Sequence, residues 1–459
     1  MSDIATRTGA VRPICRVGNL LIDFYEWLPR IVAECVPDPA PRAVEDGFSP
    51  GFRFPELDER VRMFLAAASV TWRPLAEYGG RRLTLLDLTG NPGTNTTKTF
   101  PSLLIVARAV EHIRRTGEPV LIFSPTSANK GTALRDAVLR ALDCGLASPE
   151  QLRIAILAPR SCLAKLRATR LSQDPRLRAL NPLFVYQGDQ PETVKTLGRD
   201  FVREYGASLR AQTGLNTWYT LDLRNYVIAD TARAFFENQV DPVTGPRLHA
   251  HAVSSAFGML GYHHGRAVLE AAGLADVTSR PATLLVQHLG APDMVVHLRW
   301  GGFATDEVPG YVRDPRTSLY HQEEDPRFPE VTHDPAEVLD PTFYTHRPPT
   351  APAMDAIITE FGGDGIVVSL AECLARYPYL RTLTHLLPAD FRELREWSLV
   401  MALTGTLNAI DRGLAGDCHD IVVHASGSYS SSDYAPVTDE MVTWVRSTVD
   451  LAAGLVPGR

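Results

Sequence analysis

The sequence offers few amines for chemistry. Its 46 lysine and arginine residues include only four lysines: Lys98, Lys130, Lys165 and Lys195. A lysine amine acts as a nucleophile or a general base when its surroundings keep it unprotonated. Lys98 lies in a stretch of small polar residues, GNPGTNTTKTF at 90–100. Lys165 and Lys195 have no such loop around them, and we expect both on the surface.

The loop before Lys98 has some features of a phosphate-binding P-loop, but the pattern does not fit. The motif G-x-x-x-x-G-K-[ST] needs glycine where Pro92 and Thr97 stand. Those glycines let the backbone wrap a phosphate, which proline and threonine do not allow. A nucleotide-binding P-loop protein is therefore kept only as an alternative.

Three further loops of small polar residues could bind an anion. They are SPTSANKGTAL (124–134), SSAFGMLG (254–261) and the end of IVVHASGS (421–428). Small and hydroxyl residues before a helix can form a cradle of N–H donors. Taken singly, each loop is better explained as an ordinary turn or helix cap.

The elements that must hold these loops alternate between strand and helix. Short apolar segments are typical of buried strands, and helical segments follow most of them. This alternation predicts an α/β fold with parallel sheets, in which ligands bind at the carboxyl ends of the strands. We expect strands at 83–88, 120–123, 154–158, 183–186, 248–253, 283–287, 366–370 and 421–424. We expect helices at 101–115, 131–143, 193–205, 226–239 and 264–272.

The order and spacing of the four loops resemble the fold-type II pyridoxal-phosphate (PLP) enzymes, which include the tryptophan synthase β subunit, threonine synthase and cysteine synthase. The resemblance covers roughly residues 80–435. TSANKG (126–131) is similar to the family's T-S-G-N-T-G loop, with Ala128 for glycine and Lys130 for threonine. SAFG (255–258) is similar to the G-N-F-G turn of threonine synthases. Ser426-Gly427 looks like the Ser-Gly after the last strand of the tryptophan synthase β subunit.

The resemblance implies a role for each matching residue. Lys98 would form the Schiff base with PLP, Asn129 would bind the 3′ oxygen of the cofactor, and Ser426 its pyridine nitrogen. Thr126 and Ser127 would bind the α-carboxylate of the substrate. The residues implied for the cofactor phosphate are Ser254, Ser255, Ala256, Phe257 and Gly258.

Two features depart from the superfamily. Thr99-Phe100-Pro101 follows the lysine, where many relatives have a charged residue, and the all-glycine phosphate loop of cysteine synthases is absent. The neutral Ser426 goes, in this superfamily, with eliminations and replacements more than with transamination.

The resulting hypothesis is a PLP-dependent lyase or transferase. It would act on an amino acid by β- or γ-elimination or replacement, with Lys98 as the base that removes the Cα proton. The alternatives are a threonine-synthase-like reaction on a phosphorylated homoserine, a PLP-binding but inactive scaffold, and the nucleotide-binding protein considered above.

We expect two three-layer α/β/α domains with mainly parallel sheets, in the fold-type II architecture. A helical N-terminal leader would cover residues 1–70. The large PLP-binding domain would comprise 71–100 and 216–459, and a small mobile domain 101–215. The segment 306–352, rich in Pro, Asp and His, would be an ordered lid or dimer contact.

Lys130 and a group of histidines have open interpretations. Lys130 stands at a helix N-terminus, where a cation is disfavoured. It is either a solvated surface lysine or the partner of a second anionic group on the substrate. The histidines are His249, His251, His263 and His264. Strand spacing puts the first two on one face, but no carboxylate or cysteine at ligand spacing completes a metal site, so we expect no metal. One histidine could still act on the leaving group.

Composition excludes several other classes. A formal net charge of -7 argues against a general nucleic-acid binder. No apolar run approaches the roughly 18 residues of a membrane span, and residues 1–16 lack the apolar core of a secretory signal. The six cysteines lie far apart and form no CxxC pair, so neither a disulfide framework nor a zinc ribbon is indicated. We expect a cytoplasmic homodimer with a small amino-acid substrate, and neither nucleic acid nor membrane as partner.

Overall fold

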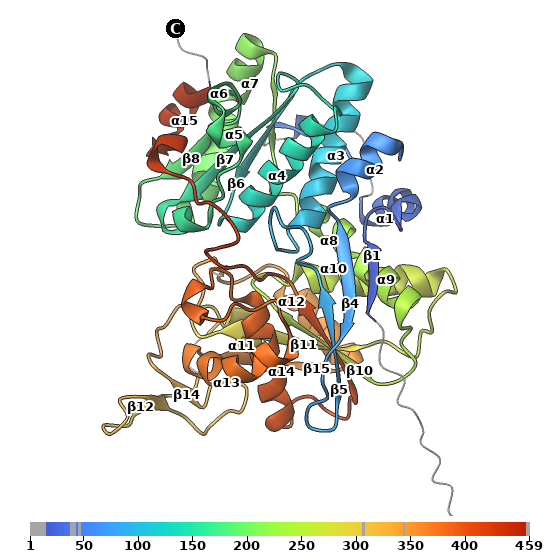
Figure 1. The fold of residues 1–459 in the computed structure, drawn as a ribbon, viewed down its shortest axis with the longest axis vertical. Coiled ribbons are helices and arrows are strands. Elements are labelled where there is room, and N and C mark those ends of the chain that lie inside the picture. The colour runs from blue at the N-terminus through green and yellow to red at the C-terminus, as the bar shows by residue number, and fades with distance from the viewer. Residues whose placement is uncertain (1–14, 37–42, 45–46, 305–307, 343–344, 456–459) are drawn as a thin grey trace, which may run out of the picture.

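The computed structural model describes residues 15–36, 43–44, 47–304, 308–342 and 345–455 (Figure 1). The chain forms two α/β units, each built on a mainly or wholly parallel sheet. The fold class expected from the sequence is thereby confirmed. Residues 1–14, which supply most of the segment expected not to be a secretory signal, lie outside the described residues. No helix in the described ranges is both long enough and apolar enough to cross a membrane.

The larger sheet has seven strands in the order β1-β4-β5-β16-β10-β11-β15. Strands β5 to β15 of this order are parallel to one another, and β4 and β1 extend one edge in antiparallel fashion. The strands are β1 (Arg16–Asn19), β4 (Ser69–Pro74), β5 (Arg82–Asp87), β10 (Arg247–Ala252), β11 (Ala282–His288), β15 (Gly363–Val368) and β16 (Asp420–Ala425).

Strand β1 differs from the helical leader expected at residues 1–70. It is a four-residue edge strand whose pattern is too short to stand out, and its pairing with β4 is a contact between distant segments. The rest of the described leader contains α1 (Leu28–Cys35), α2 (Glu59–Leu65), a 3₁₀ turn (Tyr25–Trp27) and the short hairpin of β2 (Ala43–Val44) and β3 (Gly47–Phe48).

The smaller sheet has five parallel strands in the order β17-β8-β7-β6-β9. They are β6 (Val120–Pro125), β7 (Leu152–Pro159), β8 (Leu183–Tyr186), β9 (Asn216–Tyr219) and β17 (Thr443–Val445). The expected small domain, 101–215, therefore misses β9 and β17. The last strand reaches this sheet because the C-terminal segment returns to it, and α15 (Thr448–Leu455) then packs on α7 (Thr193–Thr213).

The remaining helices cover the two sheets. They are α3 (Thr99–Thr116), α4 (Asn129–Asp143), α5 (Arg170–Gln173), α6 (Pro175–Leu180), α8 (Arg224–Asp230), α9 (Ala232–Val240), α10 (Phe257–Ala271), α11 (Asp293–Trp300), α12 (Ala351–Phe361), α13 (Leu370–Leu383) and α14 (Ser398–Asp411), with 3₁₀ turns at Arg160–Lys165, Phe391–Glu393 and Asp439–Met441. The helix expected at 226–239 is divided between α8 and α9 at Thr231. Helix α10 begins seven residues earlier than expected, because its first turns contain glycines that are more typical of a loop.

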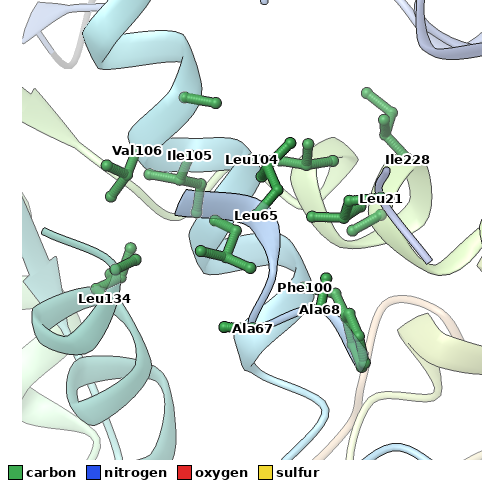
Figure 2. Close-up of a cluster of buried hydrophobic side chains, with 14 of the residues drawn as sticks. Leu21, Leu65, Ala67, Ala68, Phe100, Leu104, Ile105, Val106, Leu134 and Ile228 are labelled. Carbon is green, nitrogen blue, oxygen red and sulfur yellow. The ribbon is translucent and has the colours of Figure 1, made fainter. Parts of the chain in front are cut away.

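Helix α3 joins the two units through their shared core. It is apolar on almost every side and nearly all of its first four turns are buried, as expected of a core helix. Figure 2 shows its side chains between Leu134 of α4 on one side and Leu21 and, from α8, Ile228 on the other. Gly117 ends the helix in the left-handed conformation, with φ 74°. Because Lys98 immediately precedes α3, this packing fixes its backbone.

The described part of the 306–352 segment is ordered, as expected. It holds a small antiparallel sheet of β12 (Val312–Arg313), β13 (Tyr320–His321) and β14 (Val331–Thr332). Residues 306, 307, 343 and 344 lie outside the described residues. The end of the segment returns toward the loops that follow β5, β6 and β10, where Thr342, Thr345 and Pro349 border a cavity.

Candidate functional site

The four loops singled out from the sequence meet at one cavity of about 360 Å³. They follow β5, β6, β10 and β16, so the cavity lies at the carboxyl ends of parallel strands from both sheets. A volume of this size suits a small organic ligand. Every residue expected at the site lies on its wall: Lys98, Thr126, Ser127, Asn129, Lys130, Ser254, Ser255, Ala256, Phe257, Gly258 and Ser426.

The amine of Lys98 is available for chemistry. It has no hydrogen bond or ion pair with any described residue, and Nζ lies 5.2 Å from the centre of the Tyr226 ring. Burial lowers the pKa of Lys98, which favours the neutral, nucleophilic form. Tyr226 was not expected at the site. Its position inside a helix gave no local sign that its ring would lie against the lysine.

The loop that starts α4 is shaped by Thr126. Its Oγ1 accepts the backbone N–H groups of Ala128 at 3.1 Å and Gly131 at 2.8 Å. Only glycine fits at 131, because a Cβ there would lie 2.6 Å from Cγ2 of Thr126. Ala128 has φ 93°, a conformation that favours glycine. The loop thus keeps a strained backbone beside the cavity.

Asn129 is held in one orientation by two neighbours. Its Nδ2 donates to Oε2 of Glu396 at 2.6 Å, and its Oδ1 accepts from the Tyr429 hydroxyl at 2.8 Å. Since the Glu396 carboxylate only accepts, the amide nitrogen must face it. The second N–H of Asn129 is then left to donate to a ligand. Glu396 lies 267 positions from Asn129 and was not foreseen.

Lys130 lies inside the protein, so the alternative of a solvated surface lysine is wrong. The residue is 8% exposed, and its amine lines the cavity and donates to the backbone oxygen of Thr220. Burial, followed by the nearby charges of Lys98 and Lys195, lowers the pKa of Lys130 to about 7. An anion that enters the cavity would stabilise its charged form.

The expectation of a surface position is also wrong for Lys165. Lys195 is only partly buried and lines the cavity from α7. Lys165 is 7% exposed, and its Nζ donates to Oδ1 and Oδ2 of Asp340 at 2.7 and 2.8 Å. It also lies 3.5 Å from Oε2 of Glu396. Both carboxylates are far away in the sequence, so the residues around Lys165 carry no sign of its burial.

The turn between β10 and α10 presents unpaired donors. Within the described ranges, the backbone N–H groups of residues 254–258 have no hydrogen-bond acceptor. Ala256, at the N-cap of α10, has φ 51°. A helix N-terminus with unpaired N–H groups is suited to an anion such as phosphate.

Ser426 lies across the cavity, directly after β16. Its backbone oxygen accepts the N–H of Thr97 at 2.8 Å, which ties it to the Lys98 loop. Its hydroxyl has no hydrogen-bond partner in the described part of the chain. An unpaired amine, a cluster of N–H donors and an unpaired hydroxyl around one cavity fit the aldehyde, phosphate and pyridine nitrogen of PLP.

The histidines expected to cluster divide among three places. His249 and His251 share one face of β10, as their spacing predicted, and both lie against His424 of β16. His263 contacts Thr283 at 2.8 Å, and His264 contacts Cys35 at 3.1 Å. In the described ranges no three His, Cys, Asp or Glu side chains are grouped to hold a metal ion.

A family model described as "Family of unknown function (DUF6002)" matches residues 16–457. The chain belongs to this family. No match to the DUF6002 chain was found among curated proteins. Among solved structures it is similar to threonine synthase from Escherichia coli, with a TM-score of 0.52 and 13% identity over 86% of this chain and 81% of that one. It is also similar to threonine synthase from yeast, with a TM-score of 0.50 and 9% identity over 84% and 80%.

At such low identity these likenesses show the fold alone. The DUF6002 chain has the mixed α/β architecture of fold-type II PLP enzymes such as threonine synthase. The expected architecture is therefore confirmed, whereas the role of each site residue stays a prediction.

Proposed function

We propose that the chain is a PLP-dependent enzyme that carries its cofactor on Lys98 and acts on an amino acid by β- or γ-elimination or replacement. The observation that supports this most is the convergence on one cavity of three groups that have no hydrogen-bond partner among the described residues: the Lys98 amine, the N–H groups of residues 254–258 and the Ser426 hydroxyl. The amine suits the aldehyde of PLP, the N–H groups suit its phosphate, and the hydroxyl suits its pyridine nitrogen.

In this proposal, separate residues of the chain transfer the proton, orient the substrate and bind the cofactor. Bound PLP would supply an electron sink for negative charge at the Cα of an amino acid. Lys98, whose pKa is lowered by burial, is suited to take the Cα proton through its Nζ. Thr126 and Ser127 lie where they could orient a substrate α-carboxylate, and Asn129 has one N–H left for the cofactor's 3′ oxygen.

Lys130 favours a substrate with a second anionic group. It lines the cavity, and its burial makes a charge without an anionic partner costly. A reaction like that of threonine synthase, on an amino acid with a phosphorylated side chain, would meet this requirement. A spectral screen of amino acids and their O-phospho and O-acyl derivatives distinguishes these substrates. Binding of PLP without a spectral change for any of them would support the inactive-scaffold alternative.

The decisive experiment is borohydride reduction of the PLP-treated protein, followed by peptide mapping. We expect a visible absorbance band before reduction and a pyridoxyl label on Lys98 afterwards. Lys98→Ala should lose both, whereas Lys195→Ala, which removes another cavity lysine, should keep them. A label on Lys130, Lys165 or Lys195 would overturn the proposal. A colourless protein that binds ATP would support the nucleotide-binding alternative.

A further inference from the structure

A series of buried, hydrogen-bonded side chains leads from Glu237 on α9, across two strands of the larger sheet, to Arg233 at the cavity. Glu237, His249, His424 and Arg233 are all 0% exposed. His249 Nε2 lies 3.0 Å from Oε1 of Glu237, and its Nδ1 lies 2.8 Å from Nε2 of His424. Nδ1 of His424 lies 3.2 Å from Nη1 of Arg233. Of these four residues, the sequence singled out only His249, whose role was left open.

The chemistry of the end groups fixes the direction of every hydrogen bond. Arg233 can only donate, so Nδ1 of His424 must be the acceptor. Burial holds the pKa of His424 well below its usual value, so the ring is neutral and carries its proton on Nε2. His424 then donates to His249, which donates to the Glu237 carboxylate. The two imidazoles therefore present a fixed acceptor to Arg233.

The carboxylate at the far end is also held firmly. Arg247 donates to Oε1 of Glu237 at 2.7 Å, and the Tyr262 hydroxyl donates to Oε2. Although burial raises it, the pKa of Glu237 is lowered to about 2 by the hydrogen bonds that the carboxylate accepts from His249 and Tyr262 and by the charge of Arg247. The hydrogen-bonded series therefore begins at a carboxylate that stays ionised over the whole physiological pH range.

Arg233 has one N–H to spare. Of its five N–H groups, Nε and one on Nη2 donate to Oδ1 of Asp230, a second on Nη2 donates to Thr97, and one on Nη1 donates to His424. The fifth, also on Nη1, has no acceptor in the described part of the chain. Nη1 lies 2.7 Å from the point that a Cβ on Gly258 would occupy, so it is directly beside the start of α10.

His251 provides a second, independent sign of a ligand at this place. It is 5% exposed, lines the cavity and stacks on His424 with ring centres 5.4 Å apart. Its Nδ1 is buried without a hydrogen-bond partner among the described residues, and its Cε1 lies 2.8 Å from the same Cβ position on Gly258. Among the described residues, Arg233 and His251 thus each have a nitrogen without a hydrogen-bond partner, and both lie beside the turn at 254–258, whose N–H groups also lack acceptors. Only glycine at 258 leaves room for them.

We propose that Arg233 binds the cofactor phosphate together with the turn at 254–258, and that His424, His249 and Glu237 position its guanidinium. This inference rests on the proposed function. Asp230 neutralises Arg233, so the pair adds hydrogen-bond donors with little net charge, while the N-terminus of α10 supplies the positive potential. Arg233 is the binding residue, and the two histidines and the glutamate act through it.

The test compares PLP with pyridoxal, which has the same ring and aldehyde but no phosphate. Apo-protein is titrated with each, and the Kd is read from tryptophan fluorescence. Arg233→Gln should weaken PLP binding by roughly ten- to a hundredfold, as expected for a lost charge-assisted hydrogen bond, and change pyridoxal binding by less than about threefold. Arg266→Gln, which removes another fully buried arginine away from the cavity, should leave the PLP-to-pyridoxal ratio unchanged.

Two further variants keep the test decisive. If Arg233→Gln does not fold, Arg233→Lys replaces it, because lysine keeps the charge but lacks the planar guanidinium. This variant should lose affinity for PLP but not for pyridoxal, by a smaller factor than Arg233→Gln. His424→Asn keeps an acceptor near Nδ1 and should retain the selectivity for PLP, whereas His424→Leu should lose it. Equal losses for PLP and pyridoxal, or no loss, would overturn the role of Arg233. A parent protein that binds no PLP would overturn the proposed function as well.

Discussion

Lys165 offers a sharp test of the buried network beside the site. Its Nζ bridges two carboxylates that are both 0% exposed, Asp340 at 2.7 Å and Glu396 at 3.5 Å. Burial alone would lower the pKa of Lys165, but the charges of Glu396 and Asp340 outweigh it and raise the pKa. The amine is therefore charged at neutral pH, and its removal in Lys165→Met leaves two buried anions together.

The loss in the free energy of unfolding depends on which buried charges each variant leaves without a partner. After Lys165→Met, Asp340 still accepts from the backbone N–H of Thr342 at 2.9 Å and of Trp397 at 3.3 Å, but no other cation of the described residues pairs with it. Breaking a buried pair in this way costs about 3–5 kcal/mol. Asp340→Asn should cost less, about 1.5–3 kcal/mol, because Lys165 keeps Glu396 as a partner.

Urea unfolding followed by circular dichroism measures both losses, provided that the m-value stays the same. The exposed pair Arg176–Glu150, with side chains 74% and 51% exposed, supplies the control, since Arg176→Met should cost at most about 1 kcal/mol. If Lys165→Met lost no more than Arg176→Met, or less than Asp340→Asn, the idea of a cation bridging two dry carboxylates would be refuted.

Two further predictions concern the loop that starts α4. Ala128→Gly should raise the free energy of unfolding by about 0.5–1 kcal/mol, because glycine adopts the φ of 93° without strain. As a control, Ala137→Gly within α4 should lower the free energy of unfolding by about 1 kcal/mol. A lower free energy of unfolding for Ala128→Gly would contradict the strain inferred at residue 128. Lys130 has its pKa lowered from 10.5 to about 7 in the folded state, so between those values the unfolded chain binds more protons and stability rises with pH. Relative to Lys130→Met, the parent should gain up to about 1.4 kcal/mol per pH unit over that range, and parallel stability–pH curves would argue against the shift.

Local patterns were enough to predict the α/β class and most parallel strands. The strand Leu183–Tyr186 has the bounds that were expected, because a short apolar run between two turns is typical of a buried strand. The edge strand Arg16–Asn19 was missed because it is held by pairing with Ser69–Pro74 rather than by its own pattern. The same holds for Thr443–Val445, which joins a sheet formed hundreds of residues earlier.

The expected site residues were found from loop composition and from a resemblance in their spacing. All of them lie on one cavity, since parallel strands bring the loops that follow them to the same edge. The residues that hold them were not foreseen. Glu396 orients Asn129 from the far end of the chain, and Arg233 lies within a helix whose local sequence resembles any amphipathic segment.

The sequence by itself determined what acts within a few positions: the cap that Thr126 gives Gly131, the alternation that puts His249 and His251 on one face, and the scarcity of lysines. Only the tertiary structure decided that His424 lies between His249 and Arg233 and that Lys165 is buried. Hydrogen-bonded turns and side-chain periodicity are local, so the residues themselves reveal them. Strand order and charge pairing arise when distant segments compete for burial, and no short stretch of sequence records which of them will meet.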